Sequence, residues 1–186
     1  MRLLLLAPPG AGKGTQGERL ASWSGVRHIA AGDLLRERAR EGSTDASTDG
    51  SQLGRLIADH QARGDLVPDQ VVLDVLTPVV VEAAARGGYI LDGFPRTLPQ
   101  ATAAAELAAR LGVTLNAAIY LHAPETVLTR RLLGRASLSG RADDNAEVIR
   151  HRLQVFAETT GPLVPYYAER GILVTFLAEL LPFLES

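Results

Sequence analysis

The stretch that decides the fold is LLLLAPPGAGKGTQ at residues 3–16, where a short apolar run leads directly into a glycine-rich segment. The glycines of this segment allow successive backbone N–H groups to turn toward phosphate oxygens, because they carry no Cβ atom. A helix beginning just after them would add the partial positive charge of its N-terminus. Lys13 can reach the terminal phosphates of a nucleotide, and Thr15 stands where such loops place a hydroxyl ligand of Mg²⁺. The stretch therefore predicts a phosphate-binding loop between a strand and a helix.

One position of this loop departs from the common pattern G-x-x-x-x-G-K, which would begin with glycine where this chain has Ala7. Alanine tolerates many backbone geometries, but a positive φ at that position would cost on the order of 1 kcal/mol. We expect the substitution to weaken the loop rather than to abolish its function.

A second segment that suits nucleotide chemistry is LDGFPRTLPQ at residues 91–100, which follows a predicted strand. Because parallel strands end at the same edge of a sheet, Asp92 and Arg96 are expected beside the phosphate-binding loop. An aspartate at that place is suited to hold Mg²⁺ through water, and the planar guanidinium of an arginine matches phosphate oxygens. The two segments together predict a nucleotide and metal site.

Short apolar runs recur along the chain between longer stretches of helical spacing, and this alternation indicates the fold class. The runs occupy residues 3–6, 26–30, 89–92, 117–122 and 172–176. Alternation of strands and helices predicts an α/β fold, in which a parallel sheet carries helices on both faces. Ligands of such sheets bind at the carboxyl ends of the strands.

Two stretches of polar or small residues are predicted to lie outside the regular core. Residues 42–51 read GSTDASTDGS, contain no apolar side chain larger than alanine, and are expected to form a loop. A helix predicted over residues 124–133 is expected to break at Gly134, and residues 136–140 are expected to form a short flap.

The composition limits the kind of protein that this chain can be. Its 186 residues are 46% hydrophobic and 22% charged, which suits one sizeable domain core. A formal net charge of −2 argues against a protein that coats nucleic acid by bulk attraction. Of the 19 basic residues all but Lys13 are arginine, so we expect phosphate recognition from individual arginine positions.

Cysteine is absent from the sequence, which excludes disulfides, thiol catalysis and thiolate metal sites. The apolar run at residues 3–6 is too short for the core of a signal peptide or for a membrane span. We therefore expect a cytoplasmic protein with neither a membrane nor a nucleic acid as partner.

Motifs in a fixed order carry a resemblance to a known family. They are GKGTQ at 12–16, GDLLR at 32–36, DGFPRTLPQ at 92–100 and GRADDN at 140–145. In this order and spacing the chain resembles the adenylate kinases over residues 1 to about 175, nearly its whole length. The combination is far more specific than any one of the motifs apart from the phosphate-binding loop.

The resemblance implies both an architecture and an activity. The architecture is a P-loop NTPase-like domain over residues 1–186, with a five-stranded parallel sheet, an acceptor-binding lid at about 30–67 and a short ATP lid at about 135–141. The activity is reversible transfer of the γ-phosphoryl group of ATP-Mg to AMP, giving two ADP. A monomer that uses Mg²⁺ is expected, and no zinc, because the short lid has no room for a structural zinc site.

The resemblance also implies roles for individual residues of this sequence. ATP would be held by Gly10, Ala11, Gly12, Lys13, Gly14, Thr15 and Arg135. AMP would be held by Ala31, Arg36, Asp65, Leu66, Val67, Gly93, Arg96, Gln100, Arg141 and Arg152. Phosphoryl transfer would be catalysed by Lys13, Arg96, Arg135, Arg141 and Arg152. Mg²⁺ would be held by Thr15 and Asp92, mainly through water.

Departures from the family pattern leave alternatives open. Ala31 stands where adenylate kinases usually carry threonine and pyrimidine monophosphate kinases usually carry alanine. A UMP/CMP kinase is therefore an alternative, which Thr97 and Gln100 oppose because pyrimidine enzymes usually carry asparagine after the GFPR arginine. Ala7 and the segment after Thr175, which lacks the family's terminal turn and long helix, motivate another alternative, a nucleotide-binding protein with impaired turnover.

Overall fold

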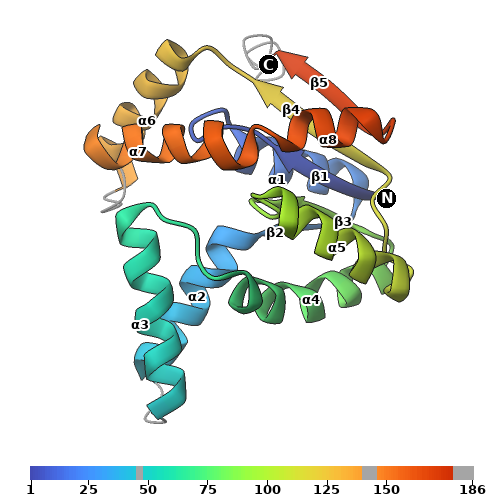
Figure 1. Ribbon diagram of the computed structural model, residues 1–186, viewed down its shortest axis with the longest axis horizontal. Helices are drawn as coiled ribbons and strands as arrows, with labels where there is room; N and C mark the ends of the chain where they lie inside the picture. Colours follow the sequence, from blue (N-terminus) through green and yellow to red (C-terminus); the bar gives the residue numbers. More distant parts are fainter. Residues whose placement is uncertain (45–47, 140–145, 178–186) are drawn as a thin grey trace.

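The computed structural model describes residues 1–44, 48–139 and 146–177, and Figure 1 shows how their helices and strands are arranged. The strands are β1 Arg2–Leu6, β2 Arg27–Ala30, β3 Tyr89–Asp92, β4 Ala117–His122 and β5 Leu173–Leu177. The helices are α1 Lys13–Ser24, α2 Ala31–Thr44, α3 Thr48–Arg63, α4 Asp69–Ala85, α5 Leu98–Leu111, α6 Glu125–Ser139, α7 Ala146–Val155 and α8 Leu163–Glu169, with a π-helix at Phe156–Thr160 between the last two. Every strand predicted from an apolar run is confirmed, with ends that differ by at most one residue.

The strands form one parallel sheet in the order β2-β3-β1-β4-β5, which confirms the predicted five-stranded α/β fold. From β1 the chain crosses to the β2 edge, returns to β3 beside β1, and then crosses to β4 on the far side of β1. The connections that follow β1 and β3 therefore leave the sheet in opposite directions. Such a reversal between adjacent strands opens a crevice at their carboxyl ends, which is where ligands of these sheets bind.

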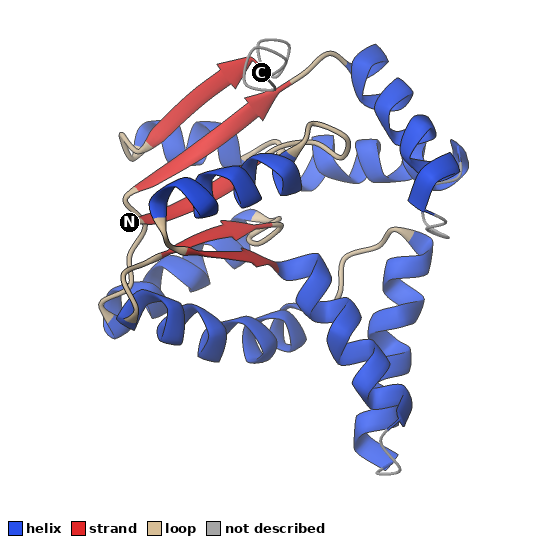
Figure 2. Ribbon diagram, turned by 180° about the vertical axis from the view of Figure 1, so that it is seen from behind, coloured by secondary structure: helices blue, strands red, loops and turns tan. Residues whose placement is uncertain are grey.

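Alternate residues of β1 face opposite sides of the sheet and serve different parts of the core. Leu3 and Leu5 pack with Leu20 of α1, whereas Leu4 and Leu6 belong to the larger cluster formed with α4, α5 and α8. Figures 1 and 2 view the sheet from opposite sides and show α1 on one face and α5 and α8 on the other. Because β1 is buried on both faces, it reads as a continuous run of leucine rather than as an alternating pattern.

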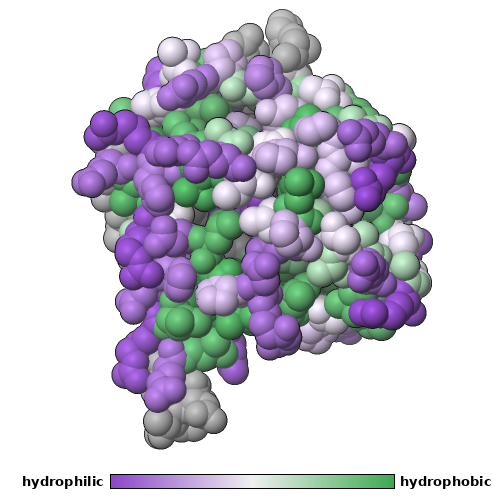
Figure 3. All heavy atoms as spheres, viewed as in Figure 1, coloured by the Kyte–Doolittle hydropathy of each residue, from purple (hydrophilic) through white to green (hydrophobic). Residues whose placement is uncertain are grey.

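The polar stretch at 42–51 is not the loop that its composition predicts. Helix α2 continues to Thr44 and α3 begins at Thr48, so within this stretch the backbone is helical except at residues 45–47, which the structure does not describe. The two helices lie side by side and project from the sheet (Figure 1), and hydrophilic side chains gather over α3 and α7 on the face that Figure 3 shows. The contact between α2 and α3 buries Ala39 and Ile57, and this packing outweighs the few tenths of a kcal/mol per residue by which Ser, Thr and Asp disfavour a helix.

The predicted break at Gly134 is also wrong, because α6 runs without interruption to Ser139. A single glycine costs a helix about 1 kcal/mol, which the surrounding turns can absorb. Leu128 and Leu132, both buried, anchor this helix to the body of the domain. Within the described residues, no helix combines the length and apolar character that a membrane span requires.

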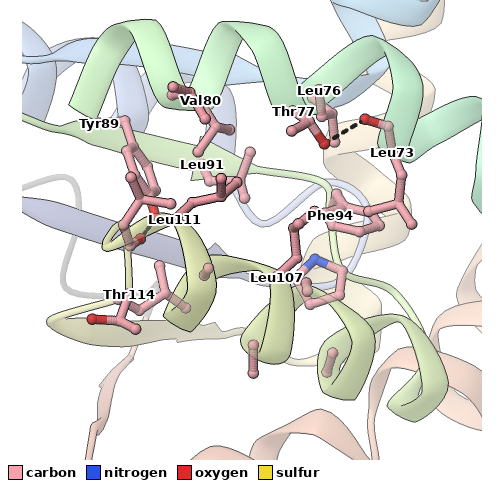
Figure 4. A pocket seen from close by; sticks show the side chains of 18 of the residues that line it. Leu73, Leu76, Thr77, Val80, Tyr89, Leu91, Phe94, Leu107, Leu111 and Thr114 are labelled. Atoms are coloured by element: carbon pink, nitrogen blue, oxygen red, sulfur yellow. Dashed lines mark hydrogen bonds between the residues drawn. The ribbon is translucent and has the colours of Figure 1, made fainter. Parts of the chain in front are cut away.

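An apolar cavity of about 200 Å³ lies between α4, α5 and α8, and Figure 4 shows the leucines and other side chains that line it. Two of its hydroxyl groups are engaged with the backbone, because Tyr89 and Thr77 each donate a hydrogen bond of 2.7 Å to a backbone carbonyl. Arg170, the one charged residue of the lining, stacks over the ring of Tyr166 at 3.5 Å. This lining lacks the several cations that a nucleotide phosphate chain requires, so the nucleotide site lies elsewhere.

Candidate active site

The loops after β1 and β3 form one continuous site because these strands are neighbours. Their register places Leu5 of β1 opposite Asp92 of β3, so both loops begin at the same level of the sheet. The loop after β1 is the glycine-rich segment, and the loop after β3 carries Arg96. The two segments that the sequence singled out therefore meet at the crevice between the two strands.

The phosphate-binding loop turns on two glycines with a left-handed backbone, Gly10 at φ +85° and Gly12 at φ +91°. A Cβ atom on Gly10 would lie 2.9 Å from the carbonyl oxygen of Leu128, so this position also needs glycine for space. Gly12 is the residue that caps α1, whose N-terminus points its free N–H groups into the loop. Gly14 has no positive φ, and a Cβ atom added there would meet nothing within 4 Å, so it is an ordinary helical residue.

Ala7 carries no backbone strain, because none of the described residues other than glycine has a positive φ. Its side chain is buried in a small cluster with Ala11 and Leu121 beside α6. The cost that a positive φ would have imposed on the loop is therefore absent.

Lys13 and Asp92 form an ion pair that joins the two loops, with 3.4 Å between Lys13 Nζ and Asp92 Oδ1. Desolvation lowers the pKa of Lys13, and the nearby Arg96 and Arg152 lower it further, while Asp92 opposes them. Desolvation raises the pKa of Asp92, but the charge of Lys13 and the interaction with His28 outweigh it, so the net direction is downward. Asp92 is therefore ionised at neutral pH despite its burial.

His28 is a member of the site that the sequence did not reveal. Its Nε2 atom lies 3.8 Å from Asp92 Oδ2 and has no hydrogen-bond partner at ordinary distance within the described chain. The ring occupies space that only glycine leaves free, since a Cβ atom on Gly17 of α1 would lie 2.3 Å from Nε2. His28 and Gly17 thus pack behind the carboxylate that faces the phosphate-binding loop.

Arg96 and Arg152 lie close together at the centre of the site. Arg96 is accessible to solvent, yet the surrounding protein desolvates its guanidinium and lowers its pKa, and the charges of Arg152 and Arg36 act in the same direction. Like charges gathered in this way favour an anion between them. Arg96 Nε donates to the carbonyl of Gly93 at 2.8 Å, which fixes the direction of its side chain.

Two adjoining cavities share these arginines. A cavity of about 80 Å³ is lined by residues of α2, of the α3 end and of the loop after β3, and we refer to it as the acceptor cavity. A cavity of about 70 Å³, the transfer cavity, is lined by Lys13, by the phosphate-binding loop and by the π-helix. The residues that line both are Gly64, Leu66, Gly93, Arg96 and Arg152. A group bound in one cavity is thus next to a group bound in the other.

Most residues expected to hold AMP line the acceptor cavity. Those that do are Arg36, Asp65, Leu66, Val67, Gly93, Arg96, Gln100 and Arg152. Ala31 is buried and is not among the residues that line the cavity. It lies next to the lining, because a Cβ atom added to Gly93 would be 3.8 Å from the Cβ atom of Ala31. The side chain of Arg135 and the whole of Arg141 lie outside the described residues, and so do the two expectations that rest on them.

Contacts that the sequence did not reveal hold these residues in place. Asp33 accepts a hydrogen bond from Arg36 one helical turn later, a spacing of three residues that the sequence displays. Thr160 of the π-helix donates to the carbonyl of Arg96 at 2.8 Å, and Asp69 accepts from Gln100 at 2.5 Å. The last two pairs join residues far apart in sequence, so no local spacing could have shown them.

The oxygen atoms at the site fit Mg²⁺, which usually binds one or two protein oxygens together with water and substrate phosphates. Asp92 supplies an ionised carboxylate beside the phosphate-binding loop, and Thr15 supplies an exposed hydroxyl in the first turn of α1. Among the described residues, no group of three or more acidic, His or Cys side chains could hold a metal by itself. The donor set is therefore suited to a metal that arrives with a nucleotide.

Comparison with known proteins identifies the family of this chain. A model of the family described as "Adenylate kinase" matches residues 5–172. The chain is 43% identical over 173 residues to an adenylate kinase of Thermobifida fusca, covering 93% of this chain and 87% of that protein. It is 43% identical over 171 residues to an adenylate kinase of Xanthomonas euvesicatoria pv. vesicatoria, and this match covers 92% of this chain and 87% of that protein. On this evidence the chain belongs to the adenylate kinase family of nucleoside monophosphate kinases.

Proposed function

We propose that this chain transfers the γ-phosphoryl group of ATP-Mg reversibly to AMP, giving two ADP, across the boundary between the transfer cavity and the acceptor cavity. The observation that supports this most directly is the position of Arg96 and Arg152, which line both cavities. Two phosphate groups held on either side of these guanidinium groups would face each other in line. The acceptor phosphate is already ionised at pH 7, so the reaction needs no general base.

Catalysis then rests on positioning and on neutralising negative charge. Lys13 belongs to the loop whose N–H groups would hold the β- and γ-phosphates. Its ion pair with Asp92 supports this role, because it shows that the ammonium group can pair with a negative charge at this position. Arg96 and Arg152 would stabilise the charge on the three equatorial oxygens of the transferring group. Arg36, which donates a hydrogen bond to Asp33 and lines the acceptor cavity, would bind the acceptor phosphate from the α2 side.

Mg²⁺ bound with ATP would offset the negative charge of the phosphates, which is the chemistry that this metal supplies in phosphoryl transfer. We propose that Asp92 and Thr15 hold it, with water completing its shell. His28 would keep the Asp92 carboxylate in position from the opposite side, since its ring packs between that carboxylate and Gly17.

The remaining expectations drawn from the sequence form part of the same proposal. An acceptor lid at about 30–67 and an ATP lid at about 135–141 would close to exclude water, because an open site that activates ATP would hydrolyse it. Arg135 and Arg141 would reach the phosphates from the ATP lid. We further propose a cytoplasmic monomer that needs no zinc and has no nucleic acid or membrane partner.

The test is a coupled assay of ADP formation with ATP-Mg and AMP, UMP, CMP or no acceptor. We expect the highest kcat/KM with AMP and negligible turnover without an acceptor. Faster turnover with UMP or CMP would assign the chain to pyrimidine acceptors. ADP formation that does not depend on any acceptor, or nucleotide binding without turnover, would contradict the proposal.

A further inference from the structure

The acceptor cavity contains more polar groups than a phosphate needs. Three of its lining residues are the arginines at 36, 96 and 152, which suit the phosphate. The other polar side chains of the lining are those of Gln61, Asp65 and Gln100. Asp65 is already engaged, because its carboxylate accepts from Arg63 at 2.9 Å and lies 3.0 Å from Nε2 of His151. The two glutamine amides are therefore the candidates for reading the base of the acceptor.

The Gln100 amide is fixed by the protein on both sides. Its Oε1 atom accepts from the backbone N–H of Arg96 at 2.7 Å, and its Nε2 atom donates to Asp69 at 2.5 Å. A reversed amide would place oxygen against the Asp69 carboxylate and N–H against N–H, so only one orientation is compatible with these partners. One N–H and one lone pair remain for a ligand, in a fixed arrangement.

The Gln61 amide is fixed on one side only. Its Nε2 atom donates to the carbonyl of Gly32 at 3.3 Å, and because a carbonyl can only accept, this contact also decides which end of the amide is oxygen. Gln61 lies in the last turn of α3 and Gly32 at the start of α2, so the bond braces the amide across the two helices. Its Oε1 atom has no hydrogen-bond partner within the described part of the chain.

We propose that Gln61 is a specificity-determining residue of this enzyme, whose Oε1 accepts a hydrogen bond from the exocyclic amino group of the acceptor base. The site then selects a 6-aminopurine monophosphate over its 6-oxopurine counterpart. This inference rests on the proposed function, because it requires that the acceptor base enters this cavity. In this inference Gln61 makes the polar contact with the acceptor base that Ala31 cannot make, because Ala31 has no hydroxyl group and does not line the cavity.

The preference for a 6-aminopurine over a 6-oxopurine arises because the 6-oxo oxygen and Gln61 Oε1 are both hydrogen-bond acceptors. A 6-oxo oxygen would face Gln61 Oε1 without a proton between them, and both atoms would have been taken out of water. Reversing the amide would remove this conflict but would turn Oε1 toward the carbonyl of Gly32. Inosine monophosphate, which differs from AMP at this edge of the purine, is therefore expected to be the poorer acceptor.

The experiment compares kcat/KM for AMP and for inosine monophosphate in wild type, Gln61→Met and Gln52→Met. Methionine keeps the length and helix propensity of glutamine but offers no comparable acceptor. Gln52 is exposed on the same helix and does not line the cavity, so its variant controls for the substitution itself. We expect Gln61→Met to lower the AMP-to-inosine-monophosphate ratio about three- to tenfold, mainly through KM for AMP. Gln52→Met should keep the wild-type ratio.

A second variant separates recognition from structural support. If Gln61 only braced α2 against α3, Gln61→Met would reduce turnover of both acceptors equally and leave their ratio unchanged, which would overturn the inference. Ala31→Thr in the Gln61→Met background adds a hydroxyl near the base and should recover part of the AMP preference; no recovery of preference would count against a base in this place. Wild-type enzyme that uses AMP without preferring it to inosine monophosphate would overturn the inference alone. Wild-type enzyme that uses neither would overturn the proposed function as well.

Discussion

Lys13 Nζ lies 3.4 Å from Asp92 Oδ1, and this contact joins the loop after β1 to the end of β3. These are the two neighbouring strands whose following connections lead to opposite edges of the sheet. Both side chains are largely shielded from solvent, with exposed fractions of 22% and 11%. A phosphate chain that enters the loop would share Lys13, while Asp92 would turn to the accompanying metal. The charges that we propose for binding therefore also hold the two loops together.

Lys13→Met should lower kcat on the order of 10³-fold, because the charge on the transferring phosphoryl group would lose its closest amine. The free energy of unfolding should change little, because the loss of the ion pair with Asp92 is offset by the removal of a buried charge beside Arg96 and Arg152. Steady-state kinetics and urea unfolding measure the two effects. A variant that keeps more than a tenth of wild-type turnover would show that Lys13 has no such role.

Gly17→Ala should lower the free energy of unfolding by about 1–3 kcal/mol, because the added Cβ atom would lie 2.3 Å from the His28 ring and would displace that ring from its position beside Asp92. Gly14→Ala on the same helix is the matched control. Its added carbon would meet nothing within 4 Å, so we expect a gain of about 0.5–1 kcal/mol from helix propensity. Equal shifts in the free energy of unfolding of the two variants would contradict the packing described for His28.

Stability should fall as pH rises from 10 to 12, because burial raises the pKa of Tyr89 to about 12 from an ordinary value near 10. In that range the unfolded chain has released the phenolic proton while the folded chain still holds it, so each pH unit removes about 1.4 kcal/mol of stability from this group. Tyr89→Phe removes this contribution, although it also loses the hydrogen bond to Val113. Unfolding free energies measured across the range should show a smaller slope for the variant; an unchanged slope would mean that Tyr89 titrates alike in both states.

Gln100→Ala should reduce kcat/KM for AMP about tenfold or more and leave KM for ATP unchanged, because the amide faces the acceptor cavity and not the phosphate-binding loop. The loss in the AMP-to-CMP ratio should exceed the three- to tenfold gain that we expect from Ala31→Thr. The structure adds a reason for part of the effect, since Arg96 would lose the partner of its backbone N–H. Kinetics with both acceptors test this, and a ratio that neither variant changes would remove both residues from the base site.

The sheet was predictable from the sequence because its strands are short apolar runs that turn residues separate. The phosphate-binding loop was predictable for a similar reason, since its glycines, Lys13 and Thr15 are neighbours in the chain. Residues 42–51 misled the prediction because their composition suits a loop, whereas the packing of Ala39 and Ile57 further along the same helices decides the structure.

The supporting contacts of the site were not predictable, because each joins segments distant in sequence. Nothing near His28 in the chain indicates Asp92, and nothing near Asp69 indicates Gln100. Gln61 likewise reads as one polar residue among several on a helix, and only the folded chain brings its amide to Gly32. Local sequence thus indicated which charged residues are candidates for phosphate binding, but not which contacts hold them in place or bring Gln61 to the cavity.

The most direct test of the central claim is the stoichiometry of ATP consumption in the presence of AMP. If the phosphoryl group passes directly between nucleotides held on either side of Arg96 and Arg152, each ATP consumed yields two ADP, one AMP disappears with it, and inorganic phosphate does not accumulate. Quantifying the three nucleotides and phosphate from one reaction gives the answer. Inorganic phosphate formed in proportion to ATP consumed, with AMP left unchanged, would contradict transfer between the two cavities.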